Sequence, residues 1–165
     1  MENKVAKKAI ETIDLMSLIN VGNIKGFDLK PFLFQGLLLK EKEFRSALKA
    51  YDFEGLKDNQ LYIYCSTEAI VPRWAYMLLA SYLTESKIQH NFASTIEEAI
   101  NSFVADAIND LDVSPFTGKR VVVKGCSGKY AISEQNYIKL TQRLKPVVKA
   151  ISYGEACSMV PISKN

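Results

Sequence analysis

Short apolar runs alternate with longer helix-forming segments between residues 61 and 152, and this alternation constrains the fold more than any other feature of the chain. The apolar runs have strand length and are bounded by polar or glycine-containing turns; they lie at 61–64, 87–92, 120–124 and 147–151. Strands that alternate with helices of ten or more residues are typical of a parallel sheet covered by helices, since parallel strands need long crossover connections. The sequence therefore predicts an α/β fold.

Local signals mark the three helices between these strands. Pro72 suits a first helical turn because its φ is fixed and it has no N–H to satisfy, so a helix begins there. Thr95 and Glu98 form a capping box, in which each side chain accepts a hydrogen bond from the other residue's backbone N–H, and this pair begins the second helix. Ser133 is a suitable N-cap for the third helix, which ends before a proline.

Residues 61–152 form the predicted core, of element order βαβαβαβ, within a single three-layer domain that spans residues 1–165. Residues 1–60 mix short apolar runs with proline and glycine and predict an irregular N-terminal elaboration, and residues 153–165 predict a tail. The core strands predict a mostly parallel four-stranded sheet, for which the common doubly wound order is 2-1-3-4. With 48% hydrophobic and 24% charged residues, the chain can bury such a core.

The chain has three cysteines, and each one begins a Cys-Ser pair that follows a predicted strand. Cys65 comes directly after the first strand, Cys126 lies two residues beyond the third, and Cys157 lies a few residues beyond the fourth. In the order 2-1-3-4 these three strands are neighbours, and their carboxyl ends share one edge of the sheet. Since neighbouring strands are about 4.8 Å apart, the three loops would lie within roughly 10 Å of one another. This is the edge at which such sheets bind ligands.

Three converging thiolates are suited to zinc or to an iron–sulfur cluster, because soft sulfur ligands favour these metals and the metal deprotonates the thiol. The pattern therefore favours a metal site at Cys65, Cys126 and Cys157. Three protein ligands leave a fourth position open, as in catalytic zinc sites. The chain has no Cys-x-x-Cys pair, the strongest zinc signal, so alternatives stay open. Candidates for a fourth ligand are Glu155, Glu68 and His90.

Two other interpretations of the cysteines stay open. Free cysteine is among the most often buried residue types, so all three thiols can simply be packed as small apolar side chains. A thiol enzyme or a persulfide carrier would instead need one cysteine whose pKa is lowered by its surroundings. His90 is the one histidine of the chain, so a cysteine–histidine dyad requires it to lie beside a thiol. The sequence does not decide whether the protein is an enzyme.

The segment 72–83, PRWAYMLLASYL, is apolar on nearly all sides of a helix. Such helices are buried on more than one side. Either the N-terminal residues cover the outer side of the helix or a second copy of the chain does. The alternative function is therefore a non-catalytic structural or interaction protein that forms a homodimer through this helix, with its cysteines merely packed.

Net charge and hydropathy limit the partners and the compartment. The net charge is +3, and the basic residues are scattered singly or in pairs, without the basic patches that nucleic-acid binding needs. The N-terminal segment lacks the apolar core of a signal peptide, and the most apolar stretch is shorter than the ~20 residues of a membrane span. We therefore expect a cytoplasmic protein that binds neither nucleic acid nor membrane and keeps its cysteines as thiols.

The chain carries the motifs AIVPRWAYMLLAS, VVVKGC and YGEACSMVPI, together with FLFQGLLLKEKEFR. In these motifs it resembles an uncharacterised bacterial family catalogued as a domain of unknown function. The resemblance covers nearly the whole chain, and the cysteine-bearing stretches of the family match at Cys65, Cys126 and Cys157. The family brings no established activity. Its association with genes for sulfur mobilisation implies a setting in iron–sulfur assembly, with the proteins of that process as partners.

Overall fold

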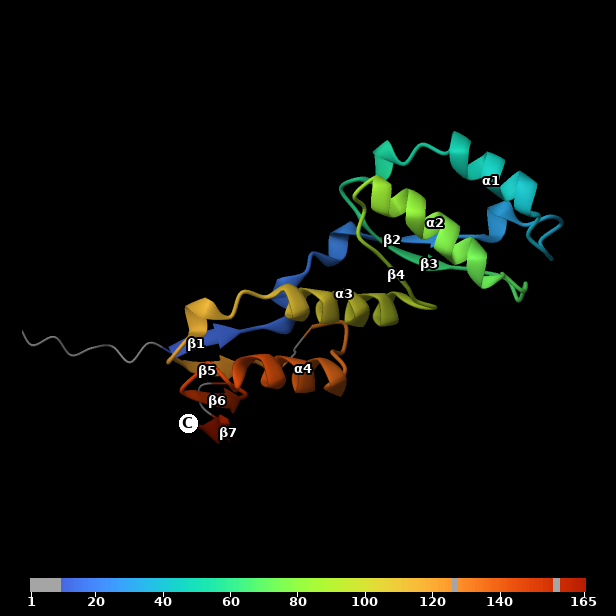
Figure 1. Ribbon diagram of the computed structural model, residues 1–165. Coiled ribbons are helices and arrows are strands. Elements are labelled where there is room, and N and C mark those ends of the chain that lie inside the picture. The colour runs from blue at the N-terminus through green and yellow to red at the C-terminus, as the bar shows by residue number, and fades with distance from the viewer. Residues whose placement is uncertain (1–9, 126–127, 156–157) are drawn as a thin grey trace, which may run out of the picture. The chain divides into compact units, whose positions relative to one another are not determined.

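The structure is a computed structural model, drawn in Figure 1, and it describes residues 10–125, 128–155 and 158–165. The chain divides into two compact units. We name Val21–Ser102 the middle unit, and Met1–Asn20 together with Phe103–Asn165 the terminal unit. Each unit contains one β-sheet.

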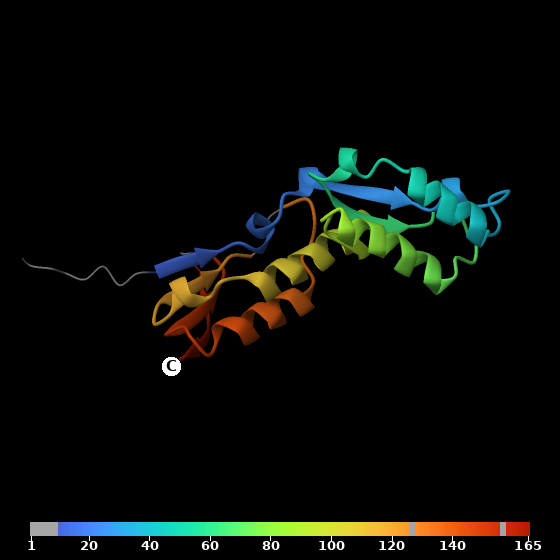
Figure 2. The same cartoon turned by 45° about the horizontal axis from the view of Figure 1, so that its top comes forward.

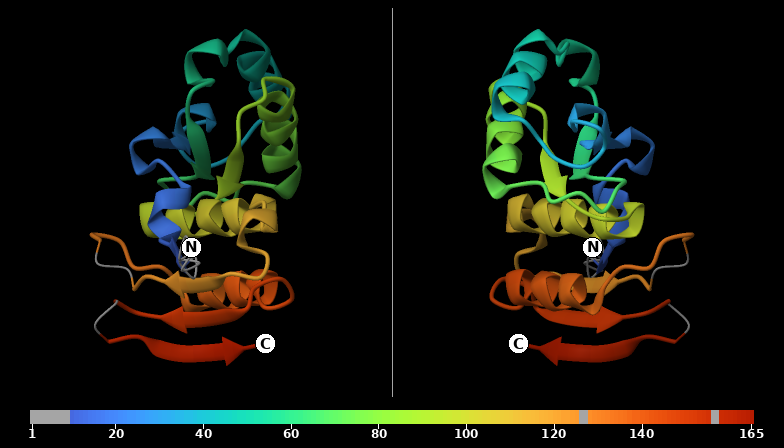
Figure 3. Two further views of the ribbon diagram at one scale, coloured as in Figure 1. Left: turned by 90° about the vertical axis from the view of Figure 1, so that its left-hand side faces the viewer. Right: turned by 90° about the vertical axis from the view of Figure 1, so that its right-hand side faces the viewer.

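The terminal unit contains helix α4 (Glu134–Leu144) and the strands β1 (Ile10–Ile13), β5 (Arg120–Val123), β6 (Ala150–Tyr153) and β7 (Val160–Lys164). The strands form a sheet in the order β1-β5-β6-β7. The first three are parallel, and β7 runs antiparallel to β6, with an irregularity in the register after Ile151. Figure 3 shows β5, β6 and β7 side by side, with α4 alongside them.

Local sequence accounts for the elements of the terminal unit. β5 ends in three valines, of which Val121 and Val123 are buried, and this alternation places one face of the strand in the core. α4 carries the buried Leu140 and Leu144 four residues apart, so both lie on its inner face. Because α4 connects the parallel neighbours β5 and β6, it is the crossover that such a pair requires.

The middle unit contains the strands β2 (Ile24–Asp28), β3 (Gln60–Tyr64) and β4 (His90–Phe92) and the helices α1 (Glu41–Ala50) and α2 (Arg73–Glu85). The three strands are parallel, in the order β2-β3-β4. α1 connects β2 to β3, and α2 connects β3 to β4 and lies alongside the sheet (Figures 1 and 2).

The remaining helices are α3 and several short 3-10 helices. Helix α3 (Ile96–Asp110) begins in the middle unit, and its residues from Phe103 onward belong to the terminal unit. Within the described ranges, no helix is long and apolar enough to cross a membrane. Short 3-10 helices lie at Leu15–Leu18, Val21–Asn23, Lys30–Phe32, Glu54–Leu56 and Ser114–Phe116.

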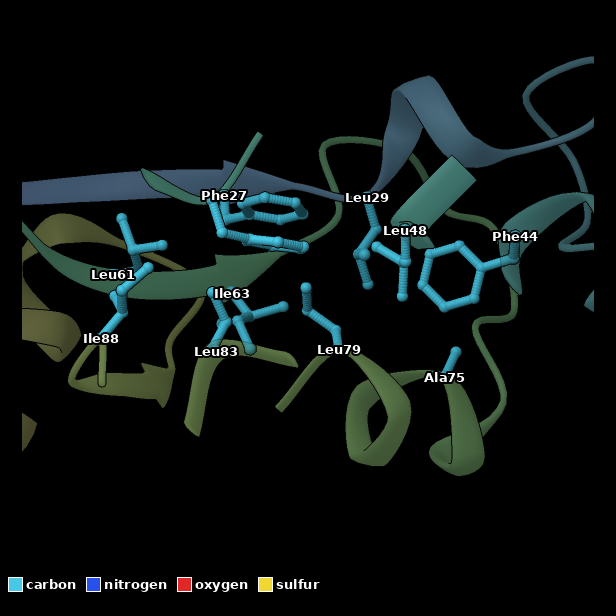
Figure 4. Packing of buried hydrophobic residues seen from close by; sticks show 11 residues of the cluster. Phe27, Leu29, Phe44, Leu48, Leu61, Ile63, Ala75, Leu79, Leu83 and Ile88 are labelled. Atoms are coloured by element: carbon cyan, nitrogen blue, oxygen red, sulfur yellow. The ribbon is translucent and has the colours of Figure 1, made fainter. Parts of the chain in front are cut away.

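The core of the middle unit lies between its sheet and its helices. Ala75, Leu79 and Leu83 recur every four residues along α2 and are fully buried. In Figure 4, Leu79 and Leu83 point from α2 toward the sheet, where Ile63 of β3 and Phe27 of β2 lie. The same cluster contains Leu29, Phe44, Leu48, Phe53, Leu61 and Ile88.

The predicted α/β class is confirmed, and the elements from β3 to β6 follow the predicted order βαβαβαβ. A mostly parallel four-stranded sheet is present, but the predicted strand order 2-1-3-4 is wrong. The predicted first and second strands, β3 and β4, lie in the sheet of the middle unit, whereas the third and fourth, β5 and β6, lie in that of the terminal unit.

The order fails because the chain outside the predicted core supplies three more strands. Residues 1–60 are not merely an irregular elaboration: β1 pairs with β5, and β2 pairs with β3. Residues 153–165 likewise contain β7, which pairs with β6. β2 and β1 therefore replace the predicted pairing of β3 with β5, whereas β7 adds a strand beyond β6. The single domain over residues 1–165 stays a prediction.

Candidate functional site

The carboxyl ends of β5 and β6 lie next to each other in the terminal unit. The two strands end in register, with Val123 opposite Tyr153, and the Gly154 N–H donates to the Val123 carbonyl at 2.9 Å. Gly154 has a φ of +115°, a backbone conformation that residues other than glycine rarely adopt. The glycine lets the chain change direction at the end of β6. A Cβ at Gly125 would lie 3.0 Å from the Tyr153 hydroxyl, so this glycine lets that ring approach the end of β5.

A cavity of about 540 Å³ opens at this end of the sheet, between the strands and α4. Its apolar lining comes from all three neighbouring strands and from the segment that leads into α4. Its polar lining consists of one carboxylate, one threonine and two tyrosines. The lining residues are Val123, Ala131, Ile132, Glu134, Tyr137, Ile138, Thr141, Ile151, Tyr153 and Ile162.

Two tyrosine rings form one wall of the cavity. Tyr137 of α4 and Tyr153 of β6 meet edge to face, with ring centroids 5.7 Å apart and an interplanar angle of 84°. The Thr141 hydroxyl donates to the Tyr137 carbonyl at 2.9 Å, so it is occupied by the helix backbone. Glu134 lies in the first turn of α4, where a carboxylate is stabilised by the positive end of the helix dipole.

Cys65 lies in the middle unit, directly after β3, as a half-buried free thiol. It packs against the hydrophobic cluster of that unit, and its Sγ lies 3.6 Å from Thr67 Oγ1. Tyr76 of α2 is its neighbour: partial burial, with a smaller contribution from the Cys65 charge, raises the pKa of the Tyr76 phenol. These surroundings are those of a packed thiol.

The three candidates for a fourth metal ligand do not all belong to one unit. Glu68 and His90 belong to the middle unit, and Glu155 belongs to the terminal unit. His90 Nδ1 lies 2.8 Å from the Ile88 carbonyl, to which it donates, so its other ring nitrogen is the one available as a ligand. Glu68 and Glu155 are exposed.

The structure does not reproduce the single sheet edge on which the three cysteines were expected to meet. β3, which precedes Cys65, belongs to one sheet, and β5 and β6 belong to the other. Cys126 and Cys157 lie outside the described residues, so the metal site stays a prediction. In the described part of the chain, no three His, Cys, Asp or Glu side chains form a group that could hold a metal ion.

One protein family has a sequence model that matches the chain over residues 1–165, with the description Protein of unknown function (DUF2480). The chain belongs to this family. Comparisons with curated proteins and with solved structures found no match. Membership of DUF2480 assigns no activity, so the function has to be argued from the residues themselves.

One polar cluster of this DUF2480 chain, centred on Asp28, was not predicted from the sequence. At the end of β2, Asp28 accepts hydrogen bonds from the Ser66 hydroxyl at 2.6 Å, the Ser66 N–H at 3.0 Å and the Lys30 N–H at 2.9 Å. Burial acts to raise the pKa of Asp28, but these hydrogen bonds outweigh it, so the pKa lies below its usual value. The serine of the first Cys-Ser pair therefore ties the end of β3 to the end of β2. The partners are 38 residues apart, so no local motif could have indicated the contact.

The helix predicted to be buried on more than one side is α2, and residues from earlier in the chain cover it. Phe44 of α1 packs on Trp74 at 6.1 Å between ring centroids, and Phe53 stacks on Tyr82 at 5.7 Å. N-terminal residues therefore cover part of this helix, and its covering by a second copy of the chain stays a prediction. Among the apolar side chains of this helix, Met77 is the exposed one, with 73% of its surface exposed.

Proposed function

We propose that the protein is an accessory in metal or iron–sulfur handling, and that Cys126 and Cys157 supply thiolate ligands to zinc or to an iron–sulfur species. The observation that carries the proposal is the pairing of β5 with β6. These parallel neighbours end in register at Val123 and Tyr153, three and four residues before the two cysteines. Strand ends of neighbouring parallel strands are where such sheets gather ligand-binding groups.

Two thiolates do not complete a zinc site, which takes three or four protein ligands. Glu155, two residues before Cys157, is the candidate for a third ligand in the same unit. Cys65 is the third member of the predicted trio, but it follows a strand of the other sheet. An incompletely coordinated metal suits an accessory that passes its cargo to a partner, such as an iron–sulfur assembly protein. A cytoplasmic setting would keep both thiols reduced.

Metal content tests this proposal. The full chain is purified without oxygen, and zinc and iron are counted per chain by mass spectrometry for the wild type, for Cys126→Ser/Cys157→Ser and for Cys65→Ser. We expect the wild type and Cys65→Ser to hold metal and the double variant to lose it. A metal-free wild type, or a double variant that keeps its metal, would overturn the proposal. Loss of metal in both variants, with metal retained by the wild type, would instead support the complete trio.

The second candidate function is a structural or interaction protein that dimerises through α2, with the cysteines merely packed. Two observations favour it: the packed surroundings of Cys65, and the exposure of Met77 on a helix whose other apolar side chains are buried or half-buried. The exposed neighbours of Met77 one turn away are Arg73 and Ser81, so the helix alone offers a single apolar side chain to a second copy. A concentration-dependent dimer in analytical ultracentrifugation is the expected result, and a monomer at all concentrations would exclude this candidate.

A further inference from the structure

We propose that the cavity at the carboxyl end of the sheet in the terminal unit binds a small molecule with an apolar or aromatic body and a cationic or neutral hydrogen-bonding group. Anionic molecules are disfavoured. The inference goes beyond the metal proposal and does not rest on it, because it is argued from the described lining residues alone, among which there is no cysteine. Loss of the metal function would leave this inference intact, and the reverse also holds.

Size and position both fit a ligand site. The cavity measures about 540 Å³. Small-molecule sites measure roughly 300–1,000 Å³, and in α/β sheets they lie beyond the carboxyl ends of the strands. Val123 and Tyr153, the last residues of β5 and β6, both line this cavity, so it reaches that edge, and Ile151 and Ile162 extend it along the face of the sheet.

The apolar walls divide into a buried base and an accessible rim. Val123, Ile132 and Ile151 are almost completely buried, so the base of the cavity is fixed by the core. Ile138 of α4 and Ile162 of β7 are 52% and 51% exposed, so a bound molecule would cover them. Covering apolar surface of this kind contributes about 25 cal/mol per Å² and favours an apolar body.

Charge favours a cation or a neutral molecule over an anion. Glu134 is the one charged side chain among the described lining residues, and the faces of aromatic rings such as those of Tyr137 and Tyr153 attract cations. The positive end of α4 would favour an anion, but Glu134 lies in the first turn and already offsets it. No lysine or arginine is among the described lining residues; the nearby Lys129 ammonium lies 5.2 Å from the Tyr130 ring, outside the cavity.

A second cavity of the same sheet provides the contrast. It measures about 270 Å³ and is lined by Arg120, Lys149 and Lys164, with no acidic side chain among its described lining residues. It is half the size of the first cavity and carries the opposite charge. An anionic probe that bound the protein would therefore be expected at this second cavity, which makes the location of binding informative.

Three naphthalene probes of matched shape test the inference on the full chain: 1-naphthylmethylamine as its cation, 1-naphthalenemethanol as the neutral form and 1-naphthaleneacetate as the anion. Amide NMR shifts locate each probe and give its affinity. We expect saturable shifts around Val123, Ile132 and Ile151, with the cation bound about fivefold to tenfold more tightly than the anion. Binding weaker than about 1 mM for both cation and alcohol, or equal binding of the anion in this cavity, would overturn the inference.

Two isoleucine substitutions in the terminal unit form a matched pair. Ile162→Trp places a large ring in the cavity, whereas Ile10→Trp adds the same ring on β1 at a residue that is similarly exposed, at 57% against 51%, and does not line it. We expect Ile162→Trp to weaken binding of the cation at least tenfold and Ile10→Trp to leave it unchanged, with the dispersion of the amide spectrum checking that each variant is folded. Unchanged binding to Ile162→Trp would contradict the inference.

Glu134→Gln separates the charge from the shape of the site. This variant keeps the volume of the side chain and removes its negative charge. It should reduce the preference for the cation over the alcohol and leave the affinity for the alcohol unchanged. A preference that survives the substitution would show that Glu134 does not set the charge selectivity, and would overturn that part of the inference.

Discussion

The two units fill their cores with different side chains. In the middle unit, Phe27, Phe44 and Trp74 belong to a chain of ring contacts that joins the sheet to both helices. In the terminal unit the buried side chains are mostly valine, leucine and isoleucine, and among its described residues one aromatic ring pair is found, Tyr137 with Tyr153. That pair lines the cavity and does not fill the core.

The two units also differ in a cavity found in each. The cavity beside β2 in the middle unit measures about 260 Å³, whereas the cavity beside α4 in the terminal unit measures about 540 Å³. The larger cavity is open to solvent, since Ile138 and Ile162 at its rim are half exposed. The proposed binding site belongs to the terminal unit, and the aromatic core of the middle unit stands in contrast to it. The following predictions challenge this contrast, beginning with the largest expected effect.

Leu79→Ala should destabilise the middle unit by about 2–5 kcal/mol, because it leaves a cavity in a packed core. Leu79 is fully buried on α2. The single tryptophan, Trp74, lies on the same helix, so its fluorescence during urea unfolding reports on this unit. Met77→Ala, two residues earlier at an exposed position, is the matched control and should change the free energy of unfolding by less than about 0.5 kcal/mol. Equal effects of both changes would disprove the close packing of this core.

Gly26→Ala should destabilise the same unit by about 1–3 kcal/mol, because it overpacks the sheet. A Cβ at Gly26 of β2 would lie 2.7 Å from the Tyr64 ring and 3.0 Å from the Tyr62 ring, both of which belong to β3. Gly55→Ala is the control: its Cβ would meet only Asp52 Oδ2, at 3.7 Å. Urea unfolding followed by Trp74 fluorescence measures both. A neutral Gly26→Ala would mean that the two rings move aside without cost.

The sequence was enough to predict the helices and strands of the core, but not which strands pair with each other. The apolar runs at 61–64 and 120–124 and the helix signals at Pro72 and Thr95 are local, and local signals predicted the elements that the structure contains. The grouping of strands into sheets depends on partners distant in sequence. Strand β2, with the sequence IKGFD, contains a glycine and two charged residues, so its pairing with β3 was not evident from its composition.

The candidate site was predicted in part for the same reason. The expectation that ligand-binding groups gather at the carboxyl ends of β5 and β6 depends on those strands being neighbours, and this neighbour relation is confirmed. The inclusion of Cys65 required a third strand in the same sheet, which β3 is not. The cavity itself could not be predicted, because Ile162 and Ile138 come from separate elements whose approach depends on packing. No spacing in the sequence connects them.

Asp28→Asn should destabilise the middle unit by about 1 kcal/mol, because it weakens the hydrogen bonds that join β2 to Ser66. The pKa of Asp28 in the folded state lies below its unfolded value, so the carboxylate adds stability above the unfolded pKa, and this contribution is lost as the pH falls through the folded pKa. The wild type and the variant should therefore converge in stability at acidic pH. Urea unfolding at a series of pH values measures this, and a difference that persists at the lowest pH would contradict it.

A matched change in the terminal unit sharpens the Asp28 result. Hydrogen bonds from Ser114 lower the pKa of Asp112, but they close a local turn between residues two apart and join no strands. Asp112→Asn should therefore have a smaller effect on stability than Asp28→Asn. If Asp112→Asn had an equal or larger effect, the contribution of Asp28 to stability would not come from joining segments that are distant in the sequence.

Met77→Lys is expected to have the smallest effect on stability, within about 0.5 kcal/mol, because the side chain is exposed and its neighbours on α2 are polar. The same change separates the two candidate functions. Dimerisation through α2 requires Met77 at the interface, so a lysine on each copy would dissociate the dimer by desolvation and like-charge repulsion. Sedimentation velocity of the wild type and the variant measures this, with Glu85→Lys at the exposed end of the same helix as control. A dimer that persists in Met77→Lys would place the contact on another surface and leave α2 with the purely structural role that its packed core already gives it.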